Sequence, residues 1–364
     1  VNSVELTSPY LTVSASKSVA TGSWVYDHES GNTYNQKITV TVPSTAPADR
    51  YDLILKTSAG DEISQAAVKV VQEFQDLYYV VHLSDVHRWQ ATSDYPMDVT
   101  AKKVEAIVDV ANIIGAEFIF ETGDMHYPFT SNPGQTAERT DIMFNGTDDW
   151  SGGDQHDVSL GVKGLNDASA AVFLVPGNHD TIEADYTQEP SEAVALDWYN
   201  QQYGLAYYNV EYGNGRYMGV NSGMGSVPSE QVSAASSWLS SAGTGNFRVG
   251  LGHAGQSACA GLDSSVDLNM LLVGHNHFIA GDNPHDLNGK PVQYVANALR
   301  DTGTGNFECN IFRVSNSSGL YQVLGSAQSR VHLIENHTVD GINDPSNWIP
   351  MLELNFDNAN DGSS

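Results

Sequence analysis

An apolar run that ends in ligand-type side chains is the feature that most constrains the fold of this chain. Residues 172–175 are Val, Phe, Leu and Val, and the turn-forming pair Pro176-Gly177 follows them. The turn then delivers Asn178, His179 and Asp180 in succession. Because open α/β sheets place their active sites at the ends of buried strands, this run predicts a strand that leads into a functional site.

The same arrangement occurs four more times, each time after an apolar run. The polar residues that follow these runs are Asp85 and His87, then Asp124, then His253, and finally His275 and His277. Residues two apart on an extended strand point to the same side, so each pair could bind one cation. A glycine, which permits unusual backbone angles, precedes the ligand-type residue in four of the five motifs. One such motif is typical of an ordinary loop, but five with only Asp, Asn and His indicate a metal site.

From Leu77 onward, apolar runs alternate with helical spacing. Residues 78–83 and 117–120 predict buried strands, and residues 100–114 predict the helix between them, which makes a βαβ unit. Further strands are predicted over 171–175, 207–210, 216–220, 247–251, 270–273, 292–295 and 310–314, and further helices over 193–203 and 228–239. The sequence therefore predicts a layered α/β domain whose sheet is covered by helices.

Residues 1–74 have a different pattern and predict a separate all-β domain. Apolar and polar residues alternate over 37–42 and 51–56, and a Pro-containing turn lies between them. We expect a small β-sandwich of the immunoglobulin or fibronectin type, acting as a spacer or as a wall on the substrate side. The catalytic domain is expected over 75–335, and the polar residues 336–364 are expected to form a tail or linker.

The charge balance limits the class of partner. The chain has 44 Asp and Glu against 16 Lys and Arg, a formal net charge of −28. Since phosphate backbones are bound by clusters of Lys and Arg, this balance argues against nucleic acid as the natural partner. No apolar run reaches the length of a membrane span, so we expect a soluble protein in a secreted or extracytoplasmic setting. The chain begins at Val1 and no leader is visible, which leaves a removed leader open.

Two other features leave alternatives open. Cys259 and Cys309 allow at most one disulfide, which nothing in the sequence requires, and the absence of Cys-x-x-Cys excludes thiolate zinc sites. Residues 128–165 are polar, rich in glycine and too long for an ordinary connector. We expect a solvated loop near the substrate there, although its Asp and His residues leave a further cation site open.

The five motifs between Leu77 and Val314 resemble those of the calcineurin-like metallophosphoesterase superfamily, which includes purple acid phosphatases and class III cyclic-nucleotide phosphodiesterases. The resemblance implies a β-sandwich core of two mixed sheets flanked by helices, with two metal ions such as Fe, Zn or Mn. It implies Asp85, His87 and His277 as ligands of the first ion and Asn178, His253 and His275 as ligands of the second. Asp124 would bridge the two ions, and His179 would approach the leaving group.

The implied reaction is hydrolysis of a phosphomonoester or phosphodiester by a hydroxide that bridges the ions. Two cations about 3.5–4 Å apart can hold both oxygens of an in-line displacement. The ligands do not distinguish the two ester classes, so small-molecule, nucleotide and lipid phosphate esters all remain candidate substrates. The alternative is a surface or binding protein that retains the fold and the metals without turnover.

Several neighbouring residues are weaker candidates. Arg88 and His126 lie next to predicted ligands and are candidates for contact with the substrate. Tyr127 lies where purple acid phosphatases carry a metal-bound tyrosine, but those enzymes lack the histidine that this chain has at His87. Tyr127 is therefore expected to support a ligand or to pack. His82, inside a predicted strand, is expected to be structural, and Asn221 is a candidate for orienting a site residue.

Overall fold

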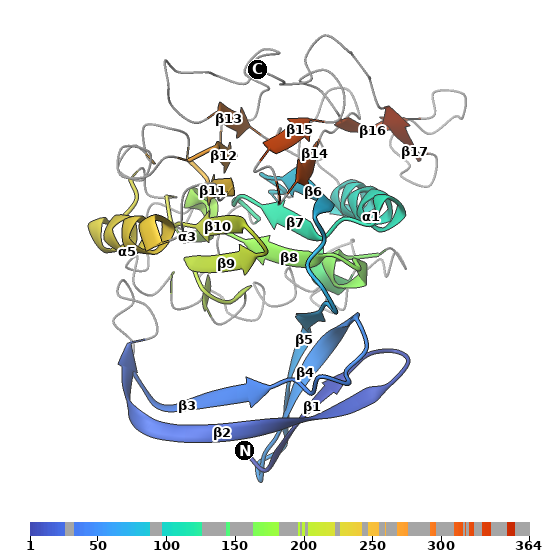
Figure 1. The fold of residues 1–364 in the computed structure, drawn as a ribbon. Helices are drawn as coiled ribbons and strands as arrows, with labels where there is room; N and C mark the ends of the chain where they lie inside the picture. Colours follow the sequence, from blue (N-terminus) through green and yellow to red (C-terminus); the bar gives the residue numbers. More distant parts are fainter. Residues whose placement is uncertain are drawn as a thin grey trace, which may run out of the picture.

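The computed structural model describes residues 1–25, 33–87, 97–125, 143–145, 163–181, 196, 199–200, 203–222, 226–241, 247–254, 259, 268–275, 292–295, 309–315, 317, 320–323, 330–335 and 348–353 (Figure 1). Their strands form three five-stranded sheets and one two-stranded sheet. Two of the five-stranded sheets lie together and carry the helices, and the third lies at the amino-terminal end of the molecule (Figure 1).

The amino-terminal sheet is antiparallel, with the order β3-β2-β1-β4-β5. Its strands are β1 (Ser3–Thr7), β2 (Thr12–Val25), β3 (Thr33–Thr41), β4 (Asp49–Lys56) and β5 (Asp61–Val70). The alternating segments 37–42 and 51–56 lie in or next to β3 and β4, as predicted. Val4, Leu6 and Tyr51 are buried. The immunoglobulin-like type and the domain boundary near residue 74 stay predictions.

The other two large sheets are both mixed. One has the order β15-β14-β6-β7-β8, with β6, β7 and β8 parallel to one another. Its strands are β6 (Leu77–Leu83), β7 (Phe118–Glu121), β8 (Ala171–Leu174), β14 (Asn310–Ser315) and β15 (Leu320–Val323). The other has the order β13-β12-β11-β10-β9, with β10 to β13 parallel. Its strands are β9 (Tyr208–Tyr212), β10 (Gly215–Gly219), β11 (Phe247–Leu251), β12 (Met270–Val273) and β13 (Val292–Val295).

These two sheets pack face to face. Alternate residues of β6 and β7, such as Val80 and Phe120, join Val249 of β11 and Leu272 of β12 in one buried cluster. A sheet that is buried on both faces needs continuous apolar strands, which explains why these runs do not alternate with polar residues. The two-sheet core that the family resemblance implied is therefore present; the pattern of the strands alone had indicated only a sheet covered by helices.

Helices cover the outer faces of this sandwich. Ile107 of helix α1 (Met97–Ile114) shares a buried cluster with Val81 of β6, and Leu239 of α5 (Ser229–Ser241) shares another with Leu271 of β12. Both helices were predicted within a few residues of these bounds. The described residues of the helix predicted over 193–203 are also helical. Two short helical turns, η1 (Leu165–Asp167) and α3 (Asn178–Thr181), flank β8. In the described part of the chain, no helix is long and apolar enough to cross a membrane.

One segment of the expected tail is a strand. β17 (Trp348–Glu353) pairs antiparallel with β16 (Arg330–Glu335), so the expectation of a linker is wrong for these six residues. The reason is local, because Trp348, Ile349, Met351 and Leu352 give this piece an apolar character that the rest of the segment lacks. Most of residues 128–165, where we expected a solvated loop, lies outside the described residues.

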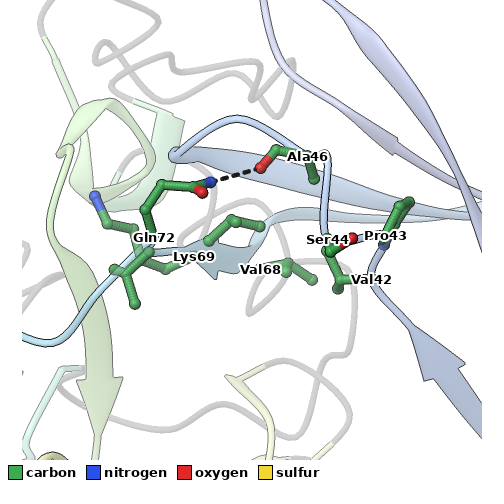
Figure 2. A pocket seen from close by; sticks show the side chains of 9 residues that line it. Val42, Pro43, Ser44, Ala46, Val68, Lys69 and Gln72 are labelled. Carbon is green, nitrogen blue, oxygen red and sulfur yellow. Dashed lines mark hydrogen bonds between the residues drawn. The ribbon is translucent and has the colours of Figure 1, made fainter.

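The amino-terminal sheet is tied to the sandwich by polar contacts. The Arg50 guanidinium donates to three backbone carbonyl oxygens, those of Ala66 (2.9 Å), Leu165 (2.7 Å) and Ala168 (2.9 Å). Lys69 Nζ donates to Ser169 O at 2.8 Å. Beside Lys69, Gln72 Nε2 donates to Ala46 O (2.8 Å) at the rim of a hollow lined largely by apolar side chains (Figure 2). The segment 165–169 is thus attached to the sheet just before β8 begins.

We expect Arg50→Ala to lower the free energy of unfolding by about 2 kcal/mol, because three carbonyl groups lose a charged donor. Burial lowers the pKa of Arg50 to about 10, so the side chain is still charged at neutral pH. Urea unfolding at neutral pH measures the change. The control Lys56→Ala removes the solvent-exposed ion pair with Asp61 and should have a much smaller effect. Equal effects of the two substitutions would contradict the anchoring role of Arg50.

Candidate metal centre

The predicted site residues gather where the parallel strands of both sheets end. Parallel strands present their carboxyl ends at the same edge, and the sandwich brings the two edges together. In the described part of the chain, the residues that follow these strands are Asp85 and His87 after β6, Asp124 after β7, Asn178 and His179 after β8, His253 after β11 and His275 after β12. His277, Arg88, His126 and Tyr127 lie outside the described residues.

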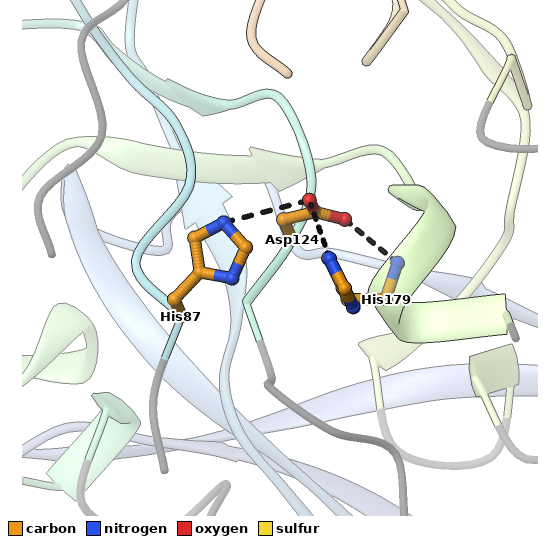
Figure 3. Close-up of side chains that lie close together, drawn as sticks. All are labelled: His87, Asp124 and His179. Carbon is orange, nitrogen blue, oxygen red and sulfur yellow. Dashed lines mark hydrogen bonds and ion pairs between the residues drawn. The ribbon is translucent and has the colours of Figure 1, made fainter. Parts of the chain in front are cut away.

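Asp124 lies at the centre of this group. Its Oδ2 faces three imidazole nitrogens, the Nε2 atoms of His253 at 3.1 Å, His87 at 3.6 Å and His179 at 4.0 Å. Its Oδ1 accepts a hydrogen bond from the backbone N–H of His179 at 2.8 Å. Figure 3 shows His87 and His179 directed towards this carboxylate from separate segments. Asp124 is therefore the residue that the histidines share.

Asn178 and Asp85 connect the remaining histidines. Asn178 Oδ1 lies 3.1 Å from His253 Nε2 and 2.9 Å from His275 Nδ1. Asp85 Oδ1 lies 3.4 Å from His87 Nε2, and its Oδ2 accepts from the backbone N–H of His275 at 2.8 Å. The structure thus brings together every predicted ligand that it describes.

The described donor atoms fit metal ions. Two groups of side chains each place their ligand atoms within 4.8 Å of one another, and these are His87, Asp124 and His179, and Asp124, His253 and His275. Asp124 Oδ2 is buried and faces imidazole nitrogens, the nearest of which, His253 Nε2, lies at 3.1 Å. Imidazole and carboxylate donors without thiolates suit Zn, Fe and Mn.

The backbone around the ligands is unusual, and the sequence did not predict this. Five non-glycine residues in the described part of the chain have positive φ, and four of them are Asp85 (53°), His87 (43°), Asp124 (58°) and His275 (71°). Such conformations are uncommon for non-glycine residues and concentrate at functional sites. Asp85 and His87 therefore converge because the chain turns after β6, and the explanation from strand alternation was wrong.

Two supporting residues received no role from the sequence. Asp180 Oδ2 accepts from the backbone N–H groups of Asp124 and Gly177, both at 2.8 Å, and so joins two of the motifs. Ser222 Oγ accepts from the backbone N–H of His253 at 2.8 Å. The role of Asp180 could have been predicted, because it directly follows His179 in the third motif. Ser222 could have been suspected because it lies shortly after β10, where the sequence analysis had named its neighbour Asn221 as the candidate. The backbone N–H of Asn221 instead donates to Gln231 Oε1 (2.9 Å).

The two cysteines lie in different parts of the domain, and Cys259 Sγ lies 3.5 Å from the backbone carbonyl oxygen of Ala254, the residue after His253. Both side chains are buried, and in the structure they are thiols rather than the halves of a disulfide. Cys259 belongs to the cluster under α5, and Cys309 belongs to the cluster under α1. The disulfide that the sequence left open is therefore not formed.

A family model described as calcineurin-like phosphoesterase matches residues 78–278, which is more than half of the 364-residue chain. The chain belongs to this family. The matched residues contain all five motifs, and membership makes the protein a phosphoesterase whose His and Asp clusters are its candidate metal sites. Among curated proteins, no sequence matches the chain significantly.

Solved structures resemble this phosphoesterase in fold. A purple acid phosphatase, PPD1 from yellow lupin (Lupinus luteus) seeds, matches with a TM-score of 0.51 and 12% identity over 89% of this chain and 67% of that chain. A dimetal phosphatase from Danio rerio matches with a TM-score of 0.45 and 9% identity over 68% of this chain and 99% of that chain. At these identities, the first match shows a shared fold and nothing more specific.

The ion pair between Asp124 and His253 shifts the pKa of both groups. Burial alone would raise the pKa of Asp124, but the imidazoles of His253 and His87 outweigh it, so the pKa is lowered. Burial alone would lower the pKa of His253, but Asp124 raises it to about 9. In the metal-free phosphoesterase, His253 therefore carries a proton at neutral pH, and a cation must displace it.

For the metal-free protein we expect the free energy of unfolding to fall as the pH rises from about 6.5 to about 9. The folded pKa of His253 lies above its unfolded value, so its contribution is complete below the lower limit and is lost as His253 deprotonates. Urea unfolding of chelated protein at several pH values measures this slope. His253→Gln should flatten the slope, and an equally steep slope in that variant would contradict the assignment.

Gly177→Ala should disturb the centre without changing any ligand. A Cβ atom at Gly177 would overlap Asp124 Oδ1 and the Asp124 backbone nitrogen. We expect a loss of roughly 1–3 kcal/mol in stability, together with weaker cation binding, because Asp124 must move. Calorimetric titration with Zn²⁺ and urea unfolding measure the two effects. The control for cation binding is Gly60→Ala, where no atom beyond the neighbouring residues lies within 4 Å of the added Cβ. Its φ of 139° makes alanine unfavourable there, so this variant should lose stability but leave cation binding unchanged.

Proposed function

We propose that this phosphoesterase hydrolyses phosphomonoesters or phosphodiesters at a centre for two cations that share Asp124. The observation that carries the proposal is the membership of Asp124 in both groups of clustered ligand atoms. A carboxylate shared in this way is what two neighbouring cations require of a protein. The fold alone does not support the proposal, because one fold can host many functions.

The proposed ligand sets follow the two sides of Asp124. His87 and Asp85, with Asp124, would hold one cation on the β6 side, and His277 completes this set from the sequence motif alone. Asn178, His253 and His275, again with Asp124, would hold the other cation. The contacts of Asn178 Oδ1 with both of these histidines support this second set.

Two bound cations would activate a water molecule and neutralise charge on the phosphoryl oxygens. The residues of the chain supply position and protons. The backbone N–H of His179 fixes Asp124 Oδ1, which leaves Oδ2 directed at the histidines. The side chain of His179 is 25% exposed, while His87 and His253 are fully buried. His179 can therefore meet an ester that enters from solvent and donate a proton to its leaving oxygen.

The net charge of the chain narrows the class of substrate. The net charge of −28 argues against a polynucleotide and leaves small-molecule, nucleotide and lipid phosphate esters. The acidic composition is also our reason for proposing an extracytoplasmic location. On the basis of sequence alone, Arg88 and His126 keep their proposed contact with the substrate, and Tyr127 keeps its proposed role in supporting a ligand or in packing.

Hydrolysis of an aryl phosphomonoester and of the matching diester tests the proposal. The protein is first chelated and then supplied with Mn²⁺, Zn²⁺, Fe²⁺ or Ni²⁺. We expect metal-dependent turnover of at least one ester, and the preference assigns phosphatase or phosphodiesterase activity. Zinc binding without turnover of either ester, with any metal, would favour the alternative of a metal-binding protein without catalysis.

Two variants separate the proposed roles. Asp124→Asn should weaken the binding of both cations and abolish turnover, because the shared carboxylate is lost. His179→Ala should bind cations as the wild type does and lose about 10²–10⁴-fold in kcat, the usual contribution of a general acid. Tyr10→Ala, at an exposed position of the amino-terminal part, is the control. Full turnover in His179→Ala would remove His179 from the reaction.

A further inference from the structure

His82 is a polar side chain buried completely behind the metal centre. It lies in β6, three residues before Asp85, and has no exposed surface. Burial lowers its pKa to about 3, so the imidazole is neutral, with one nitrogen donating and the other accepting. Buried polar groups are costly unless they are satisfied, so the two partners of this ring define what it can do.

The two partners of His82 fix the direction of its hydrogen bonds. On β14, Asn310 is the residue opposite His82, and its Nδ2 lies 3.1 Å from His82 Nδ1. An amide nitrogen only donates, so Nδ1 accepts and the proton of the neutral ring is on Nε2. His82 Nε2 then donates to Thr122 Oγ1 at 2.9 Å. The side chain of Thr122 is thus held from behind by β6 and β14.

The carbonyl group of Thr122 faces the metal centre. Its oxygen accepts from His253 Nδ1 at 2.7 Å and from Ser84 Oγ at 3.1 Å. A bond from Nδ1 leaves His253 Nε2 as the nitrogen directed at the centre, where it lies 3.1 Å from both Asp124 Oδ2 and Asn178 Oδ1. An imidazole binds a cation through the nitrogen that its other bond leaves available.

Thr122 is therefore held by hydrogen bonds at its backbone and at its side chain. Its backbone N–H donates to Leu83 O at 3.0 Å, its hydroxyl accepts a hydrogen bond from His82 Nε2, and its carbonyl oxygen accepts one from His253 Nδ1. A rotation of the peptide group between Thr122 and Gly123 would turn the Thr122 carbonyl away from His253 Nδ1. The bond from His82 opposes that rotation at a point where β7 has already ended.

We propose that His82 and Thr122 are positioning residues, which orient His253 for the second cation through the Thr122 carbonyl. This inference rests on the proposed function and adds two residues to it. His82 has no exposed surface and does not touch a substrate; it acts through Thr122. The hydroxyl of Thr122 is the specific link, and it can be removed without loss of volume.

Thr122→Val removes the hydroxyl and keeps the carbonyl, and Thr122→Ser retains both. We expect Thr122→Val to lower the affinity for one of the two Zn²⁺ ions by about 10–100-fold, the usual effect of losing a group that supports a metal ligand. The other Zn²⁺ should bind as in the wild type, and Thr122→Ser should restore the wild-type affinity of both. Competition with a chromophoric chelator measures both affinities, and Thr39→Val, at an exposed position of β3, is the control.

A second readout reports the orientation of His253 directly. In zinc-loaded protein labelled with ¹⁵N-histidine, the Nδ1–H of His253 should exchange slowly with solvent in the wild type and faster in Thr122→Val. Substitution of a residue with a merely structural role would lower the melting temperature without singling out one ion or this proton. If Thr122→Val does not fold, His82→Leu and His82→Gln make the same comparison, because glutamine can still donate to Thr122 Oγ1.

The possible results distinguish a failure of the positioning role from a failure of the two-cation proposal. If Thr122→Val or His82→Leu binds both ions like the wild type, with the His253 proton still protected, the positioning role is wrong and the two-cation proposal stands. If the wild type itself binds none of Zn²⁺, Mn²⁺, Fe²⁺ and Ni²⁺, the proposed function is wrong, and the inference falls with it.

Discussion

The carboxylate of Asp124 and the backbone around it connect the ends of three neighbouring strands. Its Oδ1 accepts from the N–H of His179, its own N–H donates to Asp180 Oδ2, and its carbonyl accepts from the N–H of His87. Asp85, Asp180 and Glu121 are buried nearby, and burial, reinforced by Asp180, raises the pKa of Glu121 well above its usual value. So many buried carboxyl groups concentrate negative potential, which the protonation of Glu121 relieves in part and which cations or protonated imidazoles balance at Asp85 and Asp124. The need for positive charge is therefore built into the core of the domain.

The sandwich supplies the rigidity that this arrangement needs. Its parallel strands are buried on both faces, by the facing sheet on one side and by α1 or α5 on the other. Positive φ at Asp85, Asp124 and His275 is unfavourable by on the order of 1 kcal/mol per residue, and it persists because the surrounding packing determines the path of the chain. Gly177 and Gly274 allow neighbouring motifs to approach more closely than a Cβ atom would permit. Packing far from the ligands thus sets the geometry of the ligands.

The amino-terminal sheet contributes to the same rigidity. Arg50 and Lys69 bind backbone carbonyls of residues 165–169, directly before the strand that leads to Asn178 and His179. A role as a spacer or as a substrate-side wall stays a prediction. The described contacts show in addition that this sheet holds the segment 165–169, which leads into β8. A substitution in the sheet can therefore alter the position of Asn178 and His179 through this segment.

The sequence by itself determined the chemistry and the class of fold. Apolar runs that end in Asp, Asn and His predicted the strands and the ligand types, since burial and metal binding each restrict residue choice locally. Periodicity does not say which buried face meets which, so only the tertiary structure decided that the strands form two packed sheets. It also decided the left-handed turns at Asp85 and His87 and the bonds from His82 through Thr122 to His253. Each of these depends on residues far apart in the chain, and local sequence carries no record of such partners.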